Sequence, residues 1–394
     1  MRICFPPTYL RRNKLKINYK LLAVIPITAV LLAACSGSTD SASSEAVKVD
    51  NSDNGSSIIA GAETLAGYDA LPFKDILPIP DGNVEVEGKD NIIIGFSQTG
   101  FGHPWRLAML ESLLLEASRH PNVSVITTDG NVDIAKQSND VDDLLSRGAD
   151  AIVMSPVESA GLTPAAKRVM AAGIPLILLD RDVDAEKTVF IGQSNIDMAY
   201  ETAKKMIADL GGKGKIVEIT GLSGSSPAQD RSKGLQKALT ESPGIEVIAT
   251  GDGGWIREPA GKLMDDWLIK HPKIDAVFAH AEESTWGVLQ SIKNANRCSD
   301  NIKQYTHDGS GPGFQAVTDG QFQADGNYSP FIGDIGFRAA VLALQGKVIP
   351  NTEAYDKPGQ WLRLPPLPVV TSENAVEWAP KGWGKFEMPK NPCK

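Results

Sequence analysis

Short apolar runs recur along the chain from residue 91 onward and alternate with stretches that have helical spacing. The apolar runs predict strands at 92–96, 123–126, 151–154, 175–179, 189–191, 216–219, 246–249, 276–279 and 304–306. The stretches between them predict helices at 104–118, 133–147, 161–172, 195–209, 229–241, 258–271 and 282–296. Apolar runs bounded by turn residues are typical of strands buried on both faces. The alternation therefore predicts an α/β fold with doubly wound parallel sheets.

The second half of the chain repeats a feature of the first half. The run Asp-Ala-Ile-Val at 150–153 matches Asp-Ala-Val-Phe at 275–278, and each run follows a helix and precedes a polar loop. We therefore expect two similar α/β lobes in tandem. Open parallel sheets bind ligands at the carboxyl ends of their strands, so these ends could face one another across a cleft.

The first 34 residues have the composition of an export signal. Six basic residues and no acidic residue precede Cys35, and the apolar run at 21–32 is too short to span a membrane. The run Leu-Ala-Ala-Cys at 32–35 resembles a bacterial lipoprotein cleavage box. It predicts lipidation of Cys35 and a membrane anchor, although an ordinary secretory signal with an incidental cysteine is the alternative. Residues 35–57 predict a flexible tether, and residues 58–90 predict an irregular lead-in.

Charge and cysteine content narrow the class of protein. The 394-residue chain has a net charge of −9, and loss of the leader's six positive charges leaves −15. Such an acidic chain is not typical of a nucleic-acid-binding protein. Once Cys4 leaves with the leader and Cys35 is lipidated, Cys298 and Cys393 could form a disulfide or remain free thiols. The five histidines include no pair at metal-binding spacing, so we expect no metal and no cofactor.

Polar and aromatic side chains follow the predicted strands. They are His103, Trp105 and Arg106 after the first strand, Asp129 after the second, Asp180 and Arg181 after the fourth, Arg231 after the sixth, Trp255 after the seventh and Asp308 after the ninth. This mixture suits a carbohydrate, because carboxylates accept hydrogen bonds from hydroxyls, guanidinium groups donate to them, and indoles stack on the C–H face of a sugar ring. Trp105 and Trp255 could sandwich the ring. Alternatively, the charged residues are helix caps or surface ion pairs, and the tryptophans belong to the core.

Residues 91–350 resemble the periplasmic sugar-binding proteins of bacterial ABC transporters, in particular those that bind ribose, galactose and galactofuranose. The resemblance is carried by Gly-Phe-Ser-Gln at 95–98, Trp-Arg at 105–106, Gly-Ala-Asp-Ala-Ile at 148–152, Ser-Pro-Val at 155–157, Ala-Gly-Ile-Pro at 172–175, Leu-Asp-Arg at 179–181 and Asp-Arg-Ser-Lys-Gly at 230–234. It implies a two-lobed clamp without enzymatic activity. Such a clamp closes around one monosaccharide and presents it to an ABC permease.

The resemblance also implies how the lobes are joined. Three crossovers, near 193–194, 327–330 and 348–351, would form a hinge. They would divide the chain into a first lobe of 91–193 plus 329–349, and a second lobe of 194–328 plus 350–394 with the tail. A ligand that contacts both lobes favours the closed form. We expect a monomer that is exported and held at the cell envelope by its lipid anchor.

The sugar contacts of the family carry over to particular residues of this chain. They are Trp105, Arg106, Asp180, Arg181, Arg231 and Asp308, with Asp129, Trp255 and Asn327 at positions that often line the site and His103 beside them. The three arginines resemble the galactofuranose branch more than the ribose branch. Ala281 is a departure, because related proteins usually have a sugar-binding asparagine there. A water, a ligand that lacks that hydroxyl, or Glu282 could fill the place.

Other classes of function fit this sequence less well or remain open. No phosphate-loop motif is present, and Gly-Leu-Ser-Gly-Ser at 221–225 lacks the last glycine of a nucleophile elbow, so an enzyme is not expected. His103 and His307 fit hydrogen-bonding or structural roles better than catalysis. Residues 1–90 predict no DNA-reading helical unit, which argues against a transcription regulator. A sensor that signals to a chemoreceptor or sensor kinase remains an alternative to transport.

Overall fold

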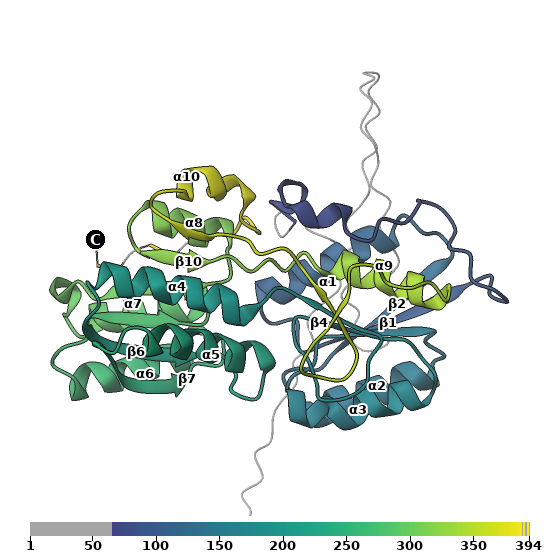
Figure 1. Ribbon diagram of the computed structural model, residues 1–394, viewed down its shortest axis with the longest axis horizontal. Helices are drawn as coiled ribbons and strands as arrows, with labels where there is room; N and C mark the ends of the chain where they lie inside the picture. Colours follow the sequence, from purple (N-terminus) through teal and green to yellow (C-terminus); the bar gives the residue numbers. More distant parts are fainter. Residues whose placement is uncertain (1–64, 388, 391, 394) are drawn as a thin grey trace, which may run out of the picture. The chain divides into compact units, whose positions relative to one another are not determined.

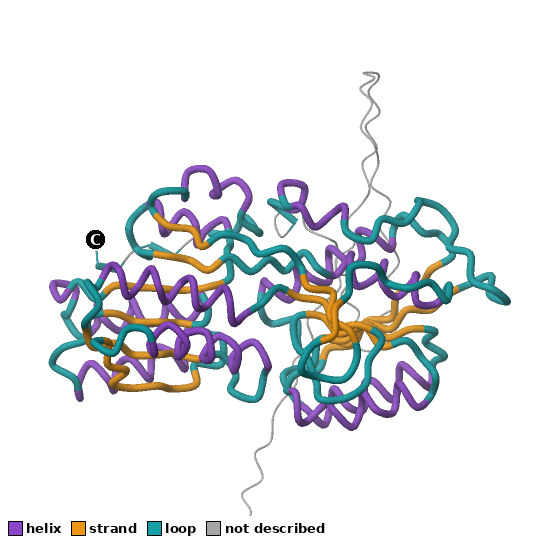
Figure 2. Tube along the Cα trace, in the orientation of Figure 1, coloured by secondary structure: helices purple, strands orange, loops and turns teal. Residues whose placement is uncertain are grey.

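A computed structural model describes residues 65–387, 389, 390, 392 and 393 of the chain. The predicted export signal, the predicted lipidation site at Cys35 and the predicted tether lie outside the described residues. Two separate β-sheets organise the described part, and each has helices on both faces (Figures 1 and 2). The predicted α/β fold with two lobes is therefore confirmed. Among the residues that the structure describes, no helix is both long and apolar enough to cross a membrane.

The sheet of the first lobe has the strand order β11-β12-β5-β4-β3-β1-β2. Its strands are β1 (Ile92–Gln98), β2 (Val123–Asp129), β3 (Ala151–Met154), β4 (Leu176–Leu179), β5 (Val189–Gly192), β11 (Glu353–Ala354) and β12 (Gln360–Arg363). Helices α1 (Pro104–Ala117) and α9 (Gly333–Leu344) pack on one face, while α2 (Ile134–Ser146) and α3 (Ser159–Ala171) pack on the other (Figure 1). The strands pair in parallel except for the β11–β12 pair.

The sheet of the second lobe has the order β13-β10-β9-β8-β6-β7. Its strands are β6 (Gly214–Thr220), β7 (Ile245–Asp252), β8 (Ala276–Ala279), β9 (Lys303–His307), β10 (Ala324–Gly326) and β13 (Val369–Thr371). Its helices are α4 (Asn195–Asp209), α5 (Ser226–Thr240), α6 (Arg257–Lys270), α7 (Glu282–Asn294), α8 (Gly311–Thr318) and α10 (Ala375–Trp378). Helices α4 and α5 cover one face, and α6 and α7 cover the other. Only β13 is antiparallel to its neighbour among these described strands.

The repeated sequence run has the same structural role in both lobes. The carboxylate of Asp150 accepts a hydrogen bond from the Ile93 amide at 2.8 Å, and that of Asp275 accepts one from the Lys215 amide at 2.7 Å. Asp150 therefore joins the start of β3 to the start of β1, and Asp275 joins the start of β8 to the start of β6. The resulting order, β2-β1-β3-β4-β5, is repeated as β7-β6-β8-β9-β10.

The chain passes between the two sheets three times, and one of these passages corrects the prediction. It leaves the first sheet after β5 at 193–194 and returns to the first lobe between β10 and α9 at 327–332. The third passage was expected near 348–351, with all of 350–394 in the second lobe, and this is wrong for 353–363. Strand β12 pairs in parallel with β5, where Trp361 lies opposite Phe190, so the chain crosses only at 364–368.

The lead-in before β1 belongs to the first lobe. It was predicted to be irregular, and its described part contains the short 3-10 helices η1 (Tyr68–Ala70) and η2 (Pro72–Asp75) and one isolated β-bridge between Val86 and Lys89. Its apolar side chains are nevertheless buried in the core of the first lobe, together with α1 and α9. Arg338 of α9 donates hydrogen bonds to the Lys74 and Ile76 carbonyl oxygens at 2.6 and 2.7 Å. The lead-in is therefore an integral layer of this lobe.

The end of the chain is covalently joined to the second lobe. A disulfide links Cys298, which follows α7, to Cys393, and the two Cα atoms are 5.5 Å apart. Both side chains pack beside the apolar cluster of α6 and α7. The tail thus has a fixed end on the second lobe.

Candidate functional site

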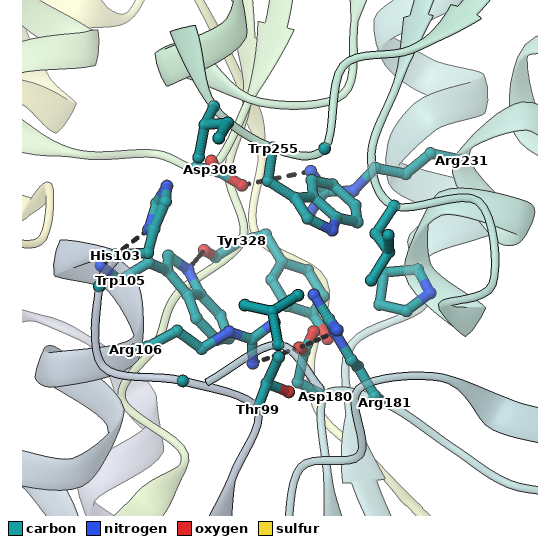
Figure 3. A pocket seen from close by; sticks show the side chains of 17 residues that line it. Thr99, His103, Trp105, Arg106, Asp180, Arg181, Arg231, Trp255, Asp308 and Tyr328 are labelled. Atoms are coloured by element: carbon teal, nitrogen blue, oxygen red, sulfur yellow. Dashed lines mark hydrogen bonds and ion pairs between the residues drawn. The ribbon is translucent and has the colours of Figure 1, made fainter. Parts of the chain in front are cut away.

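A cavity of about 290 Å³ lies where the carboxyl ends of strands from both sheets converge (Figure 3). Eight of the ten predicted ligand residues line it: His103, Trp105, Arg106, Asp180, Arg181, Arg231, Trp255 and Asp308. Asp129 and Asn327 do not line it. Tyr328 does, and so do smaller apolar residues such as Leu222 and Pro227, none of which the sequence singled out.

The start of α1 supplies one wall of the cavity from the first lobe. His103 is the N-cap of this helix, and its Nδ1 atom accepts a hydrogen bond from the Trp105 amide at 3.2 Å. The imidazole is neutral, because burial together with the nearby arginines lowers the pKa of His103. With Nδ1 acting as acceptor, the ring proton is on Nε2, which has no partner among the described residues. His103 therefore offers a hydrogen-bond donor at the cavity.

The two indoles of the site are held in different ways. Trp105 is buried, donates from Nε1 to the Tyr328 carbonyl oxygen at 3.1 Å, and stacks on the Tyr328 ring at 5.9 Å between centroids. Trp255 has a φ of 71°, an unusual conformation for a bulky residue, and its ring lies directly over Gly221. A Cβ atom at Gly221 would overlap this ring. Figure 3 shows the two indoles entering the cavity from opposite lobes.

Asp180 organises the charges on the first-lobe side. It follows β4, is 3% exposed and has a φ of 62°. Its Oδ2 atom lies 2.8 Å from Nη1 of Arg106 and 3.8 Å from Nε of Arg181. Arg181 donates from Nη1 to the Val157 carbonyl oxygen at 2.7 Å. Burial, followed by the Arg106 charge, lowers the pKa of Arg181 to about 9, and Asp180 opposes this shift.

Arg231 and Asp308 form the corresponding pair on the second-lobe side. Arg231 extends from α5, donates from Nε to Asn195 at 2.9 Å, and from Nη1 to the His280 carbonyl oxygen and to Asp308, the latter at 3.2 Å. Asp308 follows β9 with a φ of 138°. Burial raises the pKa of Asp308 to about 7, because the loss of hydration outweighs the charge of Arg231.

The sequence left open which group replaces the asparagine that related proteins have at the position of Ala281. Glu282 was one candidate to replace the missing asparagine, and this is wrong. Its carboxylate instead accepts hydrogen bonds from the amide and hydroxyl of Ser310, behind the cavity. His280 is buried in the second lobe, where Nε2 lies 3.2 Å from Glu218 and Nδ1 accepts from the Gly221 amide at 3.3 Å. His280 thus fixes the backbone of Gly221, over which the Trp255 ring lies, and its carbonyl oxygen accepts a hydrogen bond from Arg231.

Two of the predicted ligand residues, Asp129 and Asn327, do not line the cavity. Asp129 is the last residue of β2, and its Oδ1 atom accepts a hydrogen bond from the Asn131 amide at 2.8 Å. The side chain of Asn327 lies against Gly309, in the loop after β9. His307, which the sequence also placed near the cleft, is turned into the second lobe, with Nδ1 2.8 Å from the Ala279 carbonyl oxygen. None of these three side chains lines the cavity.

The lobes touch each other directly beside the cavity. The Asp182 amide of the first lobe donates to the Ser226 hydroxyl at 2.9 Å, and the Ser159 amide donates to the Gly224 carbonyl oxygen at 3.0 Å. The charged residues of the cavity are therefore largely shielded from solvent. In the described part of the chain, no group of three or more His, Cys, Asp and Glu side chains is placed to hold a metal ion.

Comparison with known proteins places this architecture in a family. A sequence profile described as "Periplasmic binding protein domain" matches residues 94–348. The chain is 28% identical over 266 residues to the ribose import binding protein RbsB of Bacillus subtilis, covering 67% of this chain and 85% of that protein. It is 28% identical over 257 residues to the galactofuranose-binding protein YtfQ of Escherichia coli, covering 63% and 80%.

Solved structures agree with the sequence comparison. The fructose binding periplasmic domain of the hybrid two component system BT1754 is 34% identical, with a TM-score of 0.66, and the match covers 73% of this chain and 93% of that domain. An ABC transporter solute binding protein from Mycobacterium smegmatis with bound glycerol is 30% identical, with a TM-score of 0.68, and the match covers 75% and 100%. The chain therefore belongs to the periplasmic binding protein family.

Proposed function

We propose that this protein captures one monosaccharide between its two lobes and delivers it to an ABC permease of the cell envelope. The observation that carries the proposal is the convergence of two buried aspartate–arginine pairs and two indoles, contributed by both lobes, on one small cavity. The relatives named for ribose and galactofuranose support a sugar as the ligand.

The chemistry of the cavity fits a polyhydroxylated ring. His103 Nε2, Arg181 Nε and Trp255 Nε1 are shielded donors without a hydrogen-bond partner among the described residues. The carboxylates of Asp180 and Asp308 are acceptors, so the cavity offers both donors and acceptors to ring hydroxyls. The indoles cover the apolar C–H faces. A volume of about 290 Å³ is at the lower end of ligand pockets, which favours a single sugar unit over an oligosaccharide.

Closure of the lobes couples binding to delivery. A sugar that contacts Asp180 on one lobe and Arg231 on the other gains all of its contacts only when the lobes meet. Binding then shifts the population toward the closed form, which is the form that a permease would recognise. The three connections at 193–194, 327–332 and 364–368 are the segments that would bend.

The remaining elements of the proposal concern where the protein acts. Cys35 would carry the lipid anchor at the cell envelope, and the protein would act as a monomer without enzymatic turnover of the sugar. A sensory role is the second candidate, because the fructose binding domain with 34% identity belongs to a hybrid two component system. Sugar uptake by cells that lack the protein separates the two. Transport predicts lost uptake of labelled sugar, whereas sensing predicts normal uptake with a lost transcriptional response.

The direct test is a thermal-shift screen against D-ribose, L-arabinose, D-xylose, D-fructose, D-galactose and myo-inositol, followed by calorimetry on any sugar that stabilises the protein. A ligand at a hundred times its Kd stabilises the folded state by about 2.7 kcal/mol, which gives a clear shift in Tm. Small-angle scattering should show compaction on saturation. Stabilisation by no sugar, or turnover of a sugar by the purified protein, would contradict the proposal.

The affinity for the sugar should rise with pH. The carboxyl group of Asp308 has a pKa raised to about 7, and a ring hydroxyl donates best to its ionised form. Binding therefore favours loss of the proton, so affinity increases as pH rises toward 7 and levels off above it. Between pH 8 and pH 5.5 we expect Kd to increase by up to about thirtyfold. Calorimetry across this range measures it, and Asp308→Asn should flatten the profile. A decrease of affinity with pH would contradict the assignment.

Substitution of Gly221 by alanine should weaken binding by displacing an indole. The new Cβ atom would overlap the Trp255 ring, so the ring must move out of its place over the strand end. We expect Kd to increase by about tenfold or more, equivalent to about 1.4 kcal/mol. Gly261→Ala is the matched control, because Gly261 of α6 does not line the cavity and a Cβ atom there makes only ordinary contacts, at 3.4 Å or more. Equal affinities of the two variants would show that Trp255 does not contact the sugar.

A further inference from the structure

Two segments outside the family match meet behind the cavity. The match spans 94–348, so the lead-in before β1 and the tail after α9 lie outside it. We call residues 378–386 of the tail the strap. The strap lies against the loop that carries Asp308, and it also touches the lead-in of the first lobe. No ligand role was assigned to it from the sequence.

The strap is joined to the Asp308 loop by three hydrogen bonds, all through Trp383. The Nε1 atom of Trp383 donates to the Asp308 carbonyl oxygen at 3.0 Å. The Trp383 amide donates to the Gly309 carbonyl oxygen at 3.3 Å, and the Gly311 amide donates to the Trp383 carbonyl oxygen at 2.9 Å. The indole is 3% exposed, so these bonds are shielded from water. Trp383 therefore binds the loop at Asp308, Gly309 and Gly311.

The Asp308 backbone needs such support. A φ of 138° is rarely adopted by a residue with a side chain, and such a conformation persists where surrounding contacts fix it. The Asp308 carbonyl oxygen accepts from Trp383 Nε1 and, at 3.3 Å, from the Tyr328 amide. With the carbonyl fixed on one side, the carboxylate is directed toward Arg231 and the cavity. The strap thus acts on the ligand site through the backbone of one residue.

The strap also reaches the first lobe. The Gly384 amide donates to the Ala66 carbonyl oxygen at 3.1 Å, and Gly67, with a φ of 85°, packs against the backbone of Gly382. The ring of Trp383 belongs to the apolar core that the lead-in shares with α1 and α9. On the other side, the disulfide at Cys393 fixes the end of the tail to the second lobe. The strap is thus attached to both lobes.

We propose that Trp383 is a positioning residue for the ligand: its indole holds the Asp308 loop in the conformation that binds the sugar, and the strap makes affinity depend on the tail of this chain. This inference rests on the proposed function. The indole N–H is the group that carries it, because the two backbone bonds would survive substitution of the side chain.

The test compares Trp383→Phe with Trp378→Phe. The first variant keeps an aromatic ring in the core and removes the N–H donor. The second is the matched control, because Trp378 lies in the same tail, is partly buried, and stacks with Lys381 rather than bonding to the Asp308 loop. With the panel sugar that binds the unaltered chain most tightly, we expect Kd to increase roughly three- to tenfold for Trp383→Phe and to change little for the control.

Two further readouts separate positioning from a merely structural role. The pH at which affinity levels off should move in Trp383→Phe and stay in the control, because the surroundings of the Asp308 carboxylate change. Amide hydrogen exchange of the sugar-free protein should speed up severalfold at Tyr328 and at Asp308–Ser310 in Trp383→Phe alone. A sugar-binding chain whose affinity is unchanged by Trp383→Phe overturns the inference. If the unaltered chain binds no sugar, the proposed function fails, and amide hydrogen exchange alone tests whether Trp383 positions the Asp308 loop. Exchange that is unchanged in Trp383→Phe overturns this role, and faster exchange supports it.

Discussion

Asp180→Ala should abolish most of the affinity for the sugar. Asp180 is buried and forms ion pairs with both Arg106 and Arg181. Its removal takes away an acceptor for the ligand and leaves two guanidinium groups close together without their shared carboxylate. Truncation of one partner of a buried charged pair costs about 2–5 kcal/mol, which corresponds to an increase in Kd of at least about thirtyfold.

The electrostatics of Arg181 point in the same direction. Burial already lowers the pKa of Arg181 to about 9, and the charge of Asp180 is what opposes this shift. Without Asp180 the pKa of Arg181 falls further, since burial and Arg106 are then opposed only by the weaker effect of Glu158. The guanidinium of the variant also loses the carboxylate that lies 3.8 Å from its Nε atom. We therefore expect Asp180→Ala to lose more affinity than a variant that lacks one hydrogen-bond acceptor at the exposed edge of the cavity.

Calorimetry with the tightest-binding panel sugar measures this effect. Asp230→Ala is the matched control, because Asp230 also precedes an arginine of the cavity, but its carboxylate pairs with Lys233 on the outside of α5 and it does not line the cavity. We expect the control to bind as the unaltered chain does. If Asp180→Ala binds equally well while retaining its fold by circular dichroism, Asp180 is not part of the site.

The sequence predicted the sheets because each buried parallel strand is a continuous apolar run. All nine predicted strands are present, from β1 to β9. Strands β10 to β13 contain no apolar run longer than two residues, and their pairing depends on contacts made far away in the chain. Trp361 of β12, for example, is held by Phe190 and by the Gly192 carbonyl oxygen. The third crossover was misplaced for this reason.

The site could be predicted wherever a side chain follows a central strand. Asp180 and Asp308 follow β4 and β9 directly, and both reach the cavity. Asp129 is the last residue of a strand, but β2 is at the edge of its sheet, and the Asp129 carboxylate accepts a hydrogen bond from the Asn131 amide. Tyr328 was missed because it lies in a crossover, whose side chains follow no strand pattern. Its place against Trp105 is a product of the tertiary fold.

Arg338→Met should cause the largest loss of stability among simple substitutions outside the cavity. Arg338 is 2% exposed and forms an ion pair with Asp334, with Glu116 at 3.7 Å, besides its bonds to the Lys74 and Ile76 carbonyl oxygens. Methionine fills a similar volume and removes the charge and every donor. Removal of one partner of a buried ion pair costs about 3–5 kcal/mol of unfolding free energy.

The unfolding free energy that Arg338→Met loses should increase with pH. This dependence would identify the broken ion pair with Asp334 as the cause of the loss. Burial raises the pKa of Asp334 to about 6, and Arg338 opposes the shift. Without Arg338 the pKa rises further, and a carboxyl group with a raised pKa loses stability as pH rises through that value. The deficit of the variant in urea unfolding should therefore be larger at pH 8 than at pH 5.

Arg363→Met is the control, because Arg363 is half-exposed in its pairs with Asp197 and Glu353. This variant should lose no more than about 1 kcal/mol of unfolding free energy. Equal losses in the two variants, or a deficit that shrinks with pH, would show that the Asp334–Arg338 pair does not hold the lead-in to α9.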